Sequence, residues 1–459
     1  MKPRKWLERF FEAPAEALEI GIEETKGLSK ELFSKKPFRI AEEYIETLGP
    51  GLTTGAADDD PSGIATYSQT GAQYGFQFLW LALFTFPLMA VVQEMCARIA
   101  IVTGVGLASN IRKEFPAPLL YICATLLFAA NVFNLGADLG AMAKALQLLV
   151  PTLNFAFAVA AFAAVSLALQ IFTTYARYAR YLKYLTLVLF AYVATAFLTH
   201  LDWKAALFHT VVPSITFSSS EILLVCAILG TTISPYLFFW QTSQEVEEEV
   251  LRGKKTVAER KHSAGKQKEI HNMRSDVWSG MLFSNAVMFF IIAACAATLY
   301  AHGITHIQSA DQAAKALEPF AGSLAYIFFA VGIIGTGMLA VPILAASSSY
   351  AISESFRWKV GLYRKLKDAY AFYGIIIVAM VVGLLMNFIG IDPIQALIYS
   401  AVGNGLVAPI VLVFIVLLSS DKKLMGSHAN GIVSKTLGWV TVALMAAAGI
   451  AVLFSLWSL

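Results

Sequence analysis

Charged residues are scarce in this chain of 459 amino acids, since Asp, Glu, Lys and Arg together make up only 14% of it. Soluble globular domains carry about 25% charged residues. Hydrophobic residues reach 58%, and the mean hydropathy is +0.65. Apolar runs that can cross about 30 Å of hydrocarbon, at about 1.5 Å per residue, recur along the chain. The composition therefore excludes an ordinary water-soluble domain and predicts an all-α polytopic membrane protein.

Cysteine is rare, and catalytic motifs are missing from the sequence. The four cysteines lie in apolar segments without metal-type spacing, so we expect packing thiols and no disulfide framework. No phosphate loop, nucleotide fingerprint, zinc motif or catalytic triad signature is present, and we expect neither an enzyme nor a resident cofactor. Because the N-terminus is charged and its first apolar run is short, we expect no cleavable signal peptide.

About eleven apolar segments meet the requirement of roughly 20 residues for a membrane span. They lie near residues 48–70, 76–100, 117–147, 153–171, 182–200, 220–244, 277–300, 321–350, 370–389, 393–418 and 436–457. Lys and Arg cluster before the first span and in every second connection after it. By the positive-inside rule, this alternation predicts a cytoplasmic N-terminus, an external C-terminus and an odd number of spans.

The chain divides accordingly into four predicted parts. They are a cytoplasmic N-terminal segment (1–45), a first transmembrane repeat (46–200), a second repeat (201–418, with a cytoplasmic loop at 245–274), and a linker with the last span (419–459). We expect an integral protein of a bacterial inner membrane.

The first and sixth spans are each interrupted by a proline. The first break has three consecutive aspartates, 58–60, before Pro61, and the second has Ser234 before Pro235. Proline lacks an N–H group, so it leaves the carbonyl four residues earlier, that of Ala57 or Thr231, without its helical partner. Carboxylates within the membrane are costly and usually functional, and many transporters build ion sites from paired discontinuous helices.

Together, the freed carbonyls and the Asp60 carboxylate would form a hard oxygen site for a cation. The breaks lie in the first and sixth spans, so each repeat unit has five spans, and an odd number inserts the second unit upside down relative to the first. The pattern therefore predicts an inverted 5+5 repeat with the ion site where the two broken helices cross.

Three segments carry a resemblance to the natural resistance-associated macrophage protein (NRAMP) transporters. QEMCARIAIVTGVGL at 93–107 resembles the end of the family's second span. Asp60-Pro61-Ser62-Gly63 lies where the family has Asp-Pro-Gly-Asn, and TTISPY at 231–236 lies where it has Ala-x-x-Met-Pro-His. The resemblance covers spans one to ten, and it implies the LeuT-type fold and divalent metal transport.

Departures from the family pattern bear on the metal. The family's asparagine ligand falls on Gly63, its methionine on Ser234, and its carbonyl ligand on Thr231. Oxygen donors favour magnesium, manganese and calcium, whereas soft donors favour later transition metals. A site without two bulky ligands is also expected to be wider and to accept a partly hydrated ion. The sequence therefore resembles the NRAMP-related magnesium transporters, with Mg²⁺ or Mn²⁺ favoured and Fe²⁺ retained as a further candidate.

Proton coupling is the second departure. The family's two histidines in the sixth span fall on Tyr236 and Gln241, which do not titrate near neutral pH. Asp138 matches a family acid that is linked to proton movement, but a plain hydrogen bond from Asn134 would explain it equally well. We therefore expect uncoupled uptake driven by the ion gradient.

Other polar residues have weaker assignments. Asp59 is expected to face the ion site or its outer vestibule, and Asp58 to cap a helix or to be solvated. Asn404 could supply an oxygen ligand, or its flanking glycines could serve helix packing. Further expectations are a structural pair of Glu94 with Arg98, close packing at Gly136 and Gly140, and a solvated face bearing Glu245, Glu247, Glu248 and Glu249.

Alternatives to an uncoupled metal transporter remain from the sequence. One is a proton-coupled Mn²⁺/Fe²⁺ transporter of the same family, and another is a Na⁺-coupled organic solute symporter on the same fold. Three acids at the break disfavour an anionic substrate. A membrane enzyme or scaffold has no motif in its favour, and the oligomeric state is left open.

Overall fold

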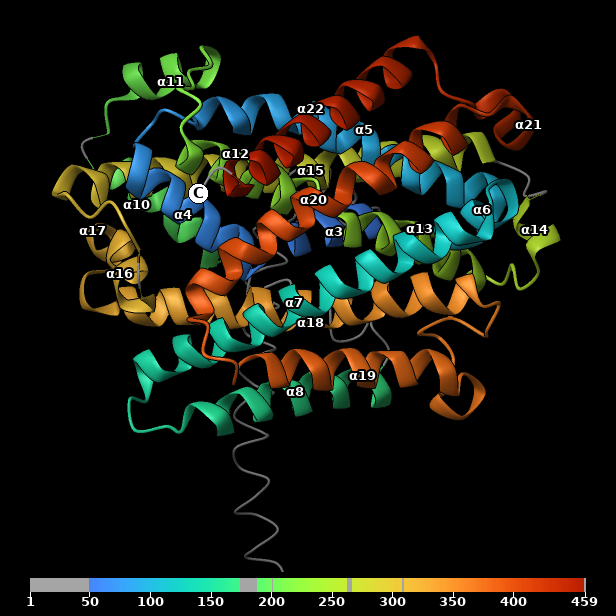
Figure 1. The fold of residues 1–459 in the computed structure, drawn as a ribbon, viewed down its shortest axis with the longest axis horizontal. Helices are drawn as coiled ribbons and strands as arrows, with labels where there is room; N and C mark the ends of the chain where they lie inside the picture. Colours follow the sequence, from blue (N-terminus) through green and yellow to red (C-terminus); the bar gives the residue numbers. More distant parts are fainter. Residues whose placement is uncertain (1–48, 174–187, 200, 262–265, 308, 458–459) are drawn as a thin grey trace, which may run out of the picture. The chain divides into compact units, whose positions relative to one another are not determined.

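The structure is a computed structural model that describes residues 49–173, 188–199, 201–261, 266–307 and 309–457. The predicted cytoplasmic segment 1–45 lies outside these residues. Residues Pro50–Leu459 form one compact unit. Its described part is helical throughout, without a strand (Figure 1).

Helices in the first half are α3 (Pro50–Asp58), α4 (Pro61–Tyr74), α5 (Leu79–Thr103), α6 (Leu107–Glu114), α7 (Ala117–Leu149), α8 (Phe155–Phe172), α10 (Phe190–Leu198) and α11 (Trp203–Val211). Those in the second half are α12 (Ser219–Thr232), α13 (Pro235–Leu251), α14 (Val257–Lys261), α15 (Lys266–Thr298), α16 (Ala310–Ala314), α17 (Glu318–Ala321), α18 (Ala325–Ser355), α19 (Tyr370–Met386), α20 (Pro393–Ser420), α21 (Lys422–Met425) and α22 (Ile432–Trp457).

Membrane spans are evident from length and composition. Eight helical segments in the described part are long and apolar enough to cross a bilayer, and α19 is a shorter apolar helix. The first predicted span is divided between α3 and α4, and the fifth is described only from its α10 portion. The chain is therefore an integral membrane protein, and the predicted interruptions of the first and sixth spans are confirmed.

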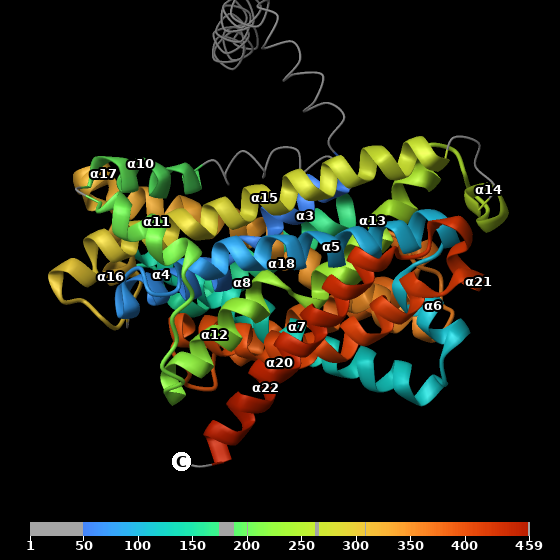
Figure 2. The same ribbon diagram turned by 90° about the horizontal axis from the view of Figure 1, so that it is seen from above.

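Helix α15 packs along both halves of the first span and along α5 (Figure 2). The Asp276 carboxylate on α15 accepts hydrogen bonds from the Gly51 amide (2.6 Å) and the Leu52 amide (3.1 Å) at the start of α3. A negative charge there complements the helix dipole. Farther along, Gly55 and Gly280 bring the two backbones together, so that a side chain at either position would overlap the other helix.

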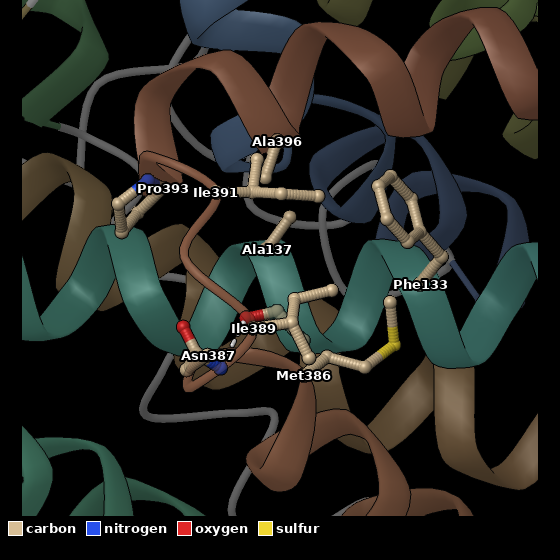
Figure 3. Close-up of a pocket in the computed structure, with 9 residues that line it drawn as sticks. Phe133, Ala137, Met386, Asn387, Ile389, Ile391, Pro393 and Ala396 are labelled. Carbon is tan, nitrogen blue, oxygen red and sulfur yellow. Dashed lines mark hydrogen bonds between the residues drawn. The ribbon is translucent and has the colours of Figure 1, made fainter.

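On the other side of the fold, α7 packs against α18, α19 and α20. Gly136 lies against Gly383 of α19, where a Cβ would approach the Gly383 carbonyl oxygen to 2.7 Å. Asn387 donates a hydrogen bond to the Gly136 carbonyl oxygen (2.9 Å), beside a cavity of only about 20 Å³ (Figure 3). Gly140 packs against Asn387 and Pro393, so both glycines serve close packing, as expected.

The Glu94–Arg98 pair connects α5 to the segment that precedes the last span. The Arg98 Nε donates to Glu94 Oε1 at 2.9 Å, and the same carboxylate oxygen receives the Arg274 Nε at 2.8 Å. Arg98 also donates to the His428 carbonyl and to the Asn430 side chain in the segment before α22. The structural role expected for this pair is thus shown by its contacts.

The acidic stretch at the end of the sixth span was predicted incorrectly as a solvated face. Helix α13 continues to Leu251, so these acids extend the sixth helix. Glu245, Glu247 and Glu249 are buried, and Glu248 is partly exposed in a pair with Arg252. Helix α13 packs against both α5 and α18, and the Tyr350 hydroxyl of α18 donates a hydrogen bond to Glu247.

Candidate ion-binding site

The site lies where the two broken spans meet. Helix α3 ends at Asp58 and α4 begins at Pro61, with Asp60 between them in an extended conformation (φ −69°, ψ 172°). Helix α12 ends at Thr232 and α13 begins at Pro235, after an extended Ser234 (φ −77°, ψ 130°). In both breaks, the residue before proline has left helical geometry, as the steric effect of the proline ring requires.

A hydroxyl group caps each carbonyl that a proline leaves free. The Tyr236 hydroxyl donates to the Ala57 carbonyl oxygen at 3.0 Å, which links α13 to the end of α3. Within the second break, the Ser234 hydroxyl donates to the Thr231 carbonyl oxygen at 2.6 Å. A carbonyl oxygen has two lone pairs, so each capped carbonyl can still accept a cation.

Asp60 is held by donors from three segments of the chain and is only 1% exposed. Its Oδ1 accepts from the Gly63 amide (2.8 Å) and the Ser62 hydroxyl (2.6 Å). Its Oδ2 accepts from the Asn134 side chain on α7 (3.1 Å), and the Tyr236 hydroxyl lies 3.4 Å away. No Lys or Arg in the described part of the chain forms an ion pair with it, so its charge is available to a cation.

Direct contacts join the two breaks. The Ser62 hydroxyl lies 3.4 Å from the Thr231 hydroxyl, and the Tyr67 hydroxyl lies 3.0 Å from that of Thr232. A Cβ on Gly63 would lie 3.2 Å from the Thr231 hydroxyl oxygen and 3.3 Å from the Asp58 carbonyl oxygen. The structure thus brings Asp60, Thr231 and Gly63 together. The space beside Gly63 is filled, which differs from the wider site expected there.

Asp58 and Asp59 face the seventh span instead of solvent. Both are fully buried. The Ser284 hydroxyl on α15 lies 2.6 Å from Asp58 Oδ2 and 3.3 Å from Asp59 Oδ1. The expectation that Asp58 is a cap or solvated is therefore wrong, and Asp59 opens onto no vestibule in this conformation. The other oxygen of each carboxylate has no hydrogen-bond partner among the described residues.

Asp138 lies on α7 one turn beyond Asn134, but the expected bond between them is absent. Asn134 instead donates to Asp60 and accepts from the Ser400 hydroxyl on α20 at 2.8 Å. Asp138 is fully buried, and neither of its oxygens has a partner in the described part of the chain. The explanation of Asp138 as a hydrogen-bonded structural acid is thus not supported.

Gln241 and Asn404 differ in how their amides are used. Gln241 accepts from the Thr54 hydroxyl at 2.6 Å and donates to Glu245 at 2.8 Å, so it joins α3 to α13. Asn404 is buried, and both polar atoms of its side chain lack partners among the described residues. The neighbouring Gly405 packs against Cys226, where a Cβ would approach the carbonyl oxygen to 2.7 Å. Gly405 therefore serves close helix packing, and the Asn404 side-chain oxygen is still available as a ligand for an ion.

The residues that sequence reasoning missed are Ser62, Tyr67, Asn134 in its contact with Asp60, and Ser284. Only Ser62 is next to a residue that the break singled out. No group of three or more His, Cys, Asp or Glu side chains that could hold a metal occurs in the described ranges. Any ion bound at the breaks would therefore use Asp60 together with carbonyl and hydroxyl oxygens.

Comparison with solved structures places this geometry on a known fold. An Eremococcus coleocola manganese transporter, in complex with an aromatic bis-isothiourea substituted compound, is 18% identical with a TM-score of 0.73, covering 91% of this chain and 88% of that one. The nucleobase-cation-symport-1 family transporter Mhp1 is 17% identical with a TM-score of 0.53, covering 89% and 91%. MhsT in complex with L-phenylalanine is 11% identical with a TM-score of 0.52, covering 89% and 98%. These likenesses confirm the LeuT-type fold.

Residues 51–455 match the family "Natural resistance-associated macrophage protein-like" (Nramp). This range includes both helix breaks and most of the last span. The chain belongs to the Nramp family.

Proposed function

We propose that this protein transports divalent metal cations across the membrane by alternating access. The observation that carries this proposal is the buried Asp60 carboxylate at the crossing of two broken helices, with no basic residue of the described part paired to it. A buried, unpaired charge is expensive unless a partner neutralises it. A cation bound by Asp60 and the Thr231 carbonyl would be that partner. Family membership and the manganese transporter named among the similar structures support the same class of substrate.

Hard cations fit the donors at this site best. Asp60, Thr231 and Ser234 offer carboxylate, carbonyl and hydroxyl oxygens and no sulfur. Such donors suit Mg²⁺, Mn²⁺ and Ca²⁺, and Mg²⁺ usually keeps several waters when it is bound through one or two carboxylates. We therefore favour Mg²⁺ or Mn²⁺ as the transported ion.

We also propose that transport is uncoupled from protons. The side chains at the two family histidine positions are engaged in structural hydrogen bonds, Tyr236 to Ala57 and Gln241 to Thr54 and Glu245. Neither side chain offers a group that exchanges protons near neutral pH.

A second candidate is a proton-coupled metal transporter, which one observation favours. Asp138 is a fully buried acid on the helix that also supplies Asn134 to Asp60, and its oxygens have no partner in the described residues. An acid inside the membrane is a default candidate for a proton relay.

The buried aspartates at the first break disfavour the other alternative, a symporter for an organic anion.

Reconstituted liposomes test both proposals in one experiment. Entry of Mg²⁺, Mn²⁺ and Ca²⁺ is followed together with a pH dye in the lumen. We expect saturable metal entry without acidification, and no metal entry with Asp60→Ala. The matched control is Asp368→Ala, which removes an exposed acid far along the chain and leaves flux unchanged.

Acidification that tracks metal entry would establish the coupled mechanism instead. Normal flux through Asp60→Ala would refute metal transport at this site. Uptake of Fe²⁺ or Cd²⁺ without competition by Mg²⁺ would refute the argument from hard donors.

A further inference from the structure

A polar cluster outside the proposed metal ligands lies where the end of α3 packs against α15 (Figure 2). Gly55 and Gly280 bring the two helix backbones into contact. About one turn later come Asp58 and Asp59 at the end of α3, and Ser284 on α15. Residues three or four positions apart lie on the same face of a helix, so the glycine contact directs the three side chains toward each other.

The Ser284 hydroxyl is within reach of both carboxylates. Its oxygen lies 2.6 Å from Asp58 Oδ2 and 3.3 Å from Asp59 Oδ1. A hydroxyl group has one hydrogen to donate and two lone pairs. The shorter distance assigns that hydrogen to Asp58, so the Asp59 oxygen faces a lone pair of the hydroxyl. Two acceptors therefore lie opposite each other, and an electropositive partner is needed at this point.

The second oxygen of each carboxylate also lacks a partner. Asp58 Oδ1 and Asp59 Oδ2 accept no hydrogen bond from the described residues, although both side chains are 0% exposed. No Lys or Arg in the described part of the chain forms an ion pair with either acid. A buried charge is costly unless it is paired and hydrogen-bonded. The two acids thus have the properties of ligands for a cation.

The number of charges at the first break favours a monovalent ion here. Residues 58–60 are three consecutive buried aspartates, which bring three negative charges to the break. Under the proposed function, a divalent cation at Asp60 neutralises two of these charges. One monovalent cation at Asp58 and Asp59 neutralises the third, whereas a second divalent cation would leave a net positive charge within the membrane, which is costly.

The spacing of the oxygens fits an ion larger than Mg²⁺. Two ligand oxygens at right angles around an ion lie about 3.4 Å apart for bonds of ~2.4 Å, but about 2.9 Å apart for the ~2.0–2.1 Å bonds of Mg²⁺. The distance of 3.3 Å between the Asp59 and Ser284 oxygens agrees with the longer bonds. Such bonds are typical of Ca²⁺ and of Na⁺, which has a similar size, and the charges at the break favour Na⁺.

We propose that Asp58, Asp59 and Ser284 form a second cation site, which holds Na⁺ next to the divalent metal. The inference rests on the proposed function for the charge of the neighbouring ion. The carboxylates supply the negative charge, and the hydroxyl supplies a neutral oxygen from α15. The bound Na⁺ also joins the end of α3 to the seventh span.

Binding of radioactive sodium tests the second site without relying on transport. Purified wild-type protein is kept in millimolar Mg²⁺, which fills the site at Asp60, and bound sodium is measured by scintillation proximity. We expect saturable binding of one sodium ion per chain, displaced by unlabelled Na⁺ but not by choline at equal ionic strength. Absence of bound sodium under these conditions would overturn the inference.

Asp58→Asn combined with Asp59→Asn removes both charges and keeps the size of the side chains. The double variant should fold, because it removes two unpaired buried acids, and its melting temperature checks this. Sodium binding should be lost in the double variant and should weaken about fivefold in Ser284→Ala. Ser275→Ala is the matched control, since it removes an exposed hydroxyl from the same helix and should leave sodium binding unchanged. Sodium binding that survives the double substitution would refute the role of the two acids.

Asp60→Ala separates this inference from the proposed function. Without divalent metal, sodium could also occupy the site at Asp60, and this variant removes that possibility. We expect Asp60→Ala to lose metal flux and to keep one sodium ion per chain. Loss of sodium binding in this variant would place the ion at Asp60 and overturn the inference. Full metal flux in the same variant would refute the proposed function alone.

Competition by Mg²⁺ and Mn²⁺ in the Asp60→Ala variant distinguishes Na⁺ from a second divalent ion. We expect millimolar metal to leave most of the sodium bound, because the site matches Na⁺ in size and charge. Complete displacement of sodium by either metal would show that Asp58 and Asp59 bind a divalent cation, and it would overturn the assignment to Na⁺.

Discussion

At the scale of single residues, hydroxyl groups replace the soft and titratable side chains that the family resemblance implies at the second break. Tyr236 and Ser234 each cap a carbonyl that a proline leaves free. An uncapped buried carbonyl costs about 1–3 kcal/mol, so these hydroxyls stabilise the breaks as well as shaping the ion site.

Tyr236→Phe should destabilise the fold and weaken ion binding together. Loss of the bond to the Ala57 carbonyl leaves a buried acceptor unpaired and removes a contact near Asp60. We expect the free energy of unfolding to fall by about 1–3 kcal/mol and metal binding to weaken roughly tenfold. Thermal unfolding and calorimetry measure the two effects. Tyr370→Phe, at a tyrosine that is 69% exposed, is the control and should change neither.

Ser234→Met should shift selectivity toward softer ions. The thioether adds a sulfur donor, which favours later transition metals over Mg²⁺. Competition of Cd²⁺ and Mg²⁺ for Mn²⁺ uptake measures the change, and we expect the ratio of inhibition constants to move at least tenfold in favour of Cd²⁺. An unchanged ratio would mean that residue 234 does not face the ion.

Sequence reasoning reached Asp60 and Thr231 because proline chemistry acts locally. It missed the Asn134–Asp60 and Ser284–Asp58 contacts, since each joins residues more than 70 positions apart and no local pattern signals the pairing. The burial of Glu245, Glu247 and Glu249 was missed for a related reason. A run of acids is usually solvated, and only tertiary packing against α5 and α18 covers this one.

At the scale of helices, glycine decides which elements can approach closely. Gly55 and Gly280 allow α3 and α15 to meet backbone to backbone, and Gly230 does the same for α12 and α20. Close approach through small residues is a common way to pack membrane helices. The positions of the helix breaks could be predicted from the prolines, but the helices that the breaks would contact could not.

Gly280→Ala should destabilise the protein, because the added methyl group would overlap the Gly51 backbone. Overpacking of this kind costs about 1–3 kcal/mol. Gly403→Ala on α20 is the matched control, since a methyl group added there would have nothing within 4 Å. For this control we expect no loss, or a gain of up to about 1 kcal/mol from higher helix propensity. Melting temperatures in detergent compare the two, and equal values would contradict the close contact.

At the scale of the whole molecule, hydropathy predicted the membrane spans, and the two proline breaks together with the family resemblance predicted the LeuT-type fold, which similar structures of only 11–18% identity share. The reason is that the bilayer imposes span length and apolarity on every member of the fold. The relative packing of the spans depends on individual contacts, such as that of Arg98 with the segment before α22, which hydropathy does not encode.

The basic connections predict a cytoplasmic N-terminus and an external C-terminus. An epitope tag at Leu459 should therefore react with antibody in intact spheroplasts, and a tag at Met1 only after the membrane is permeabilised. A C-terminal tag that reacts only after permeabilisation would show an even number of spans.

Asp276 and the paired glycines have a mechanical consequence. They fix α3 to α15 at both the N-terminus and the middle of α3, so we expect the two helices to move as one rigid unit. Only residues 59 and 60 separate this unit from α4. Asp60, the carboxylate proposed to bind the ion, therefore also lies in the short connection about which α3 and α4 can reorient, so under the proposed function ion binding would change the stiffness of that connection.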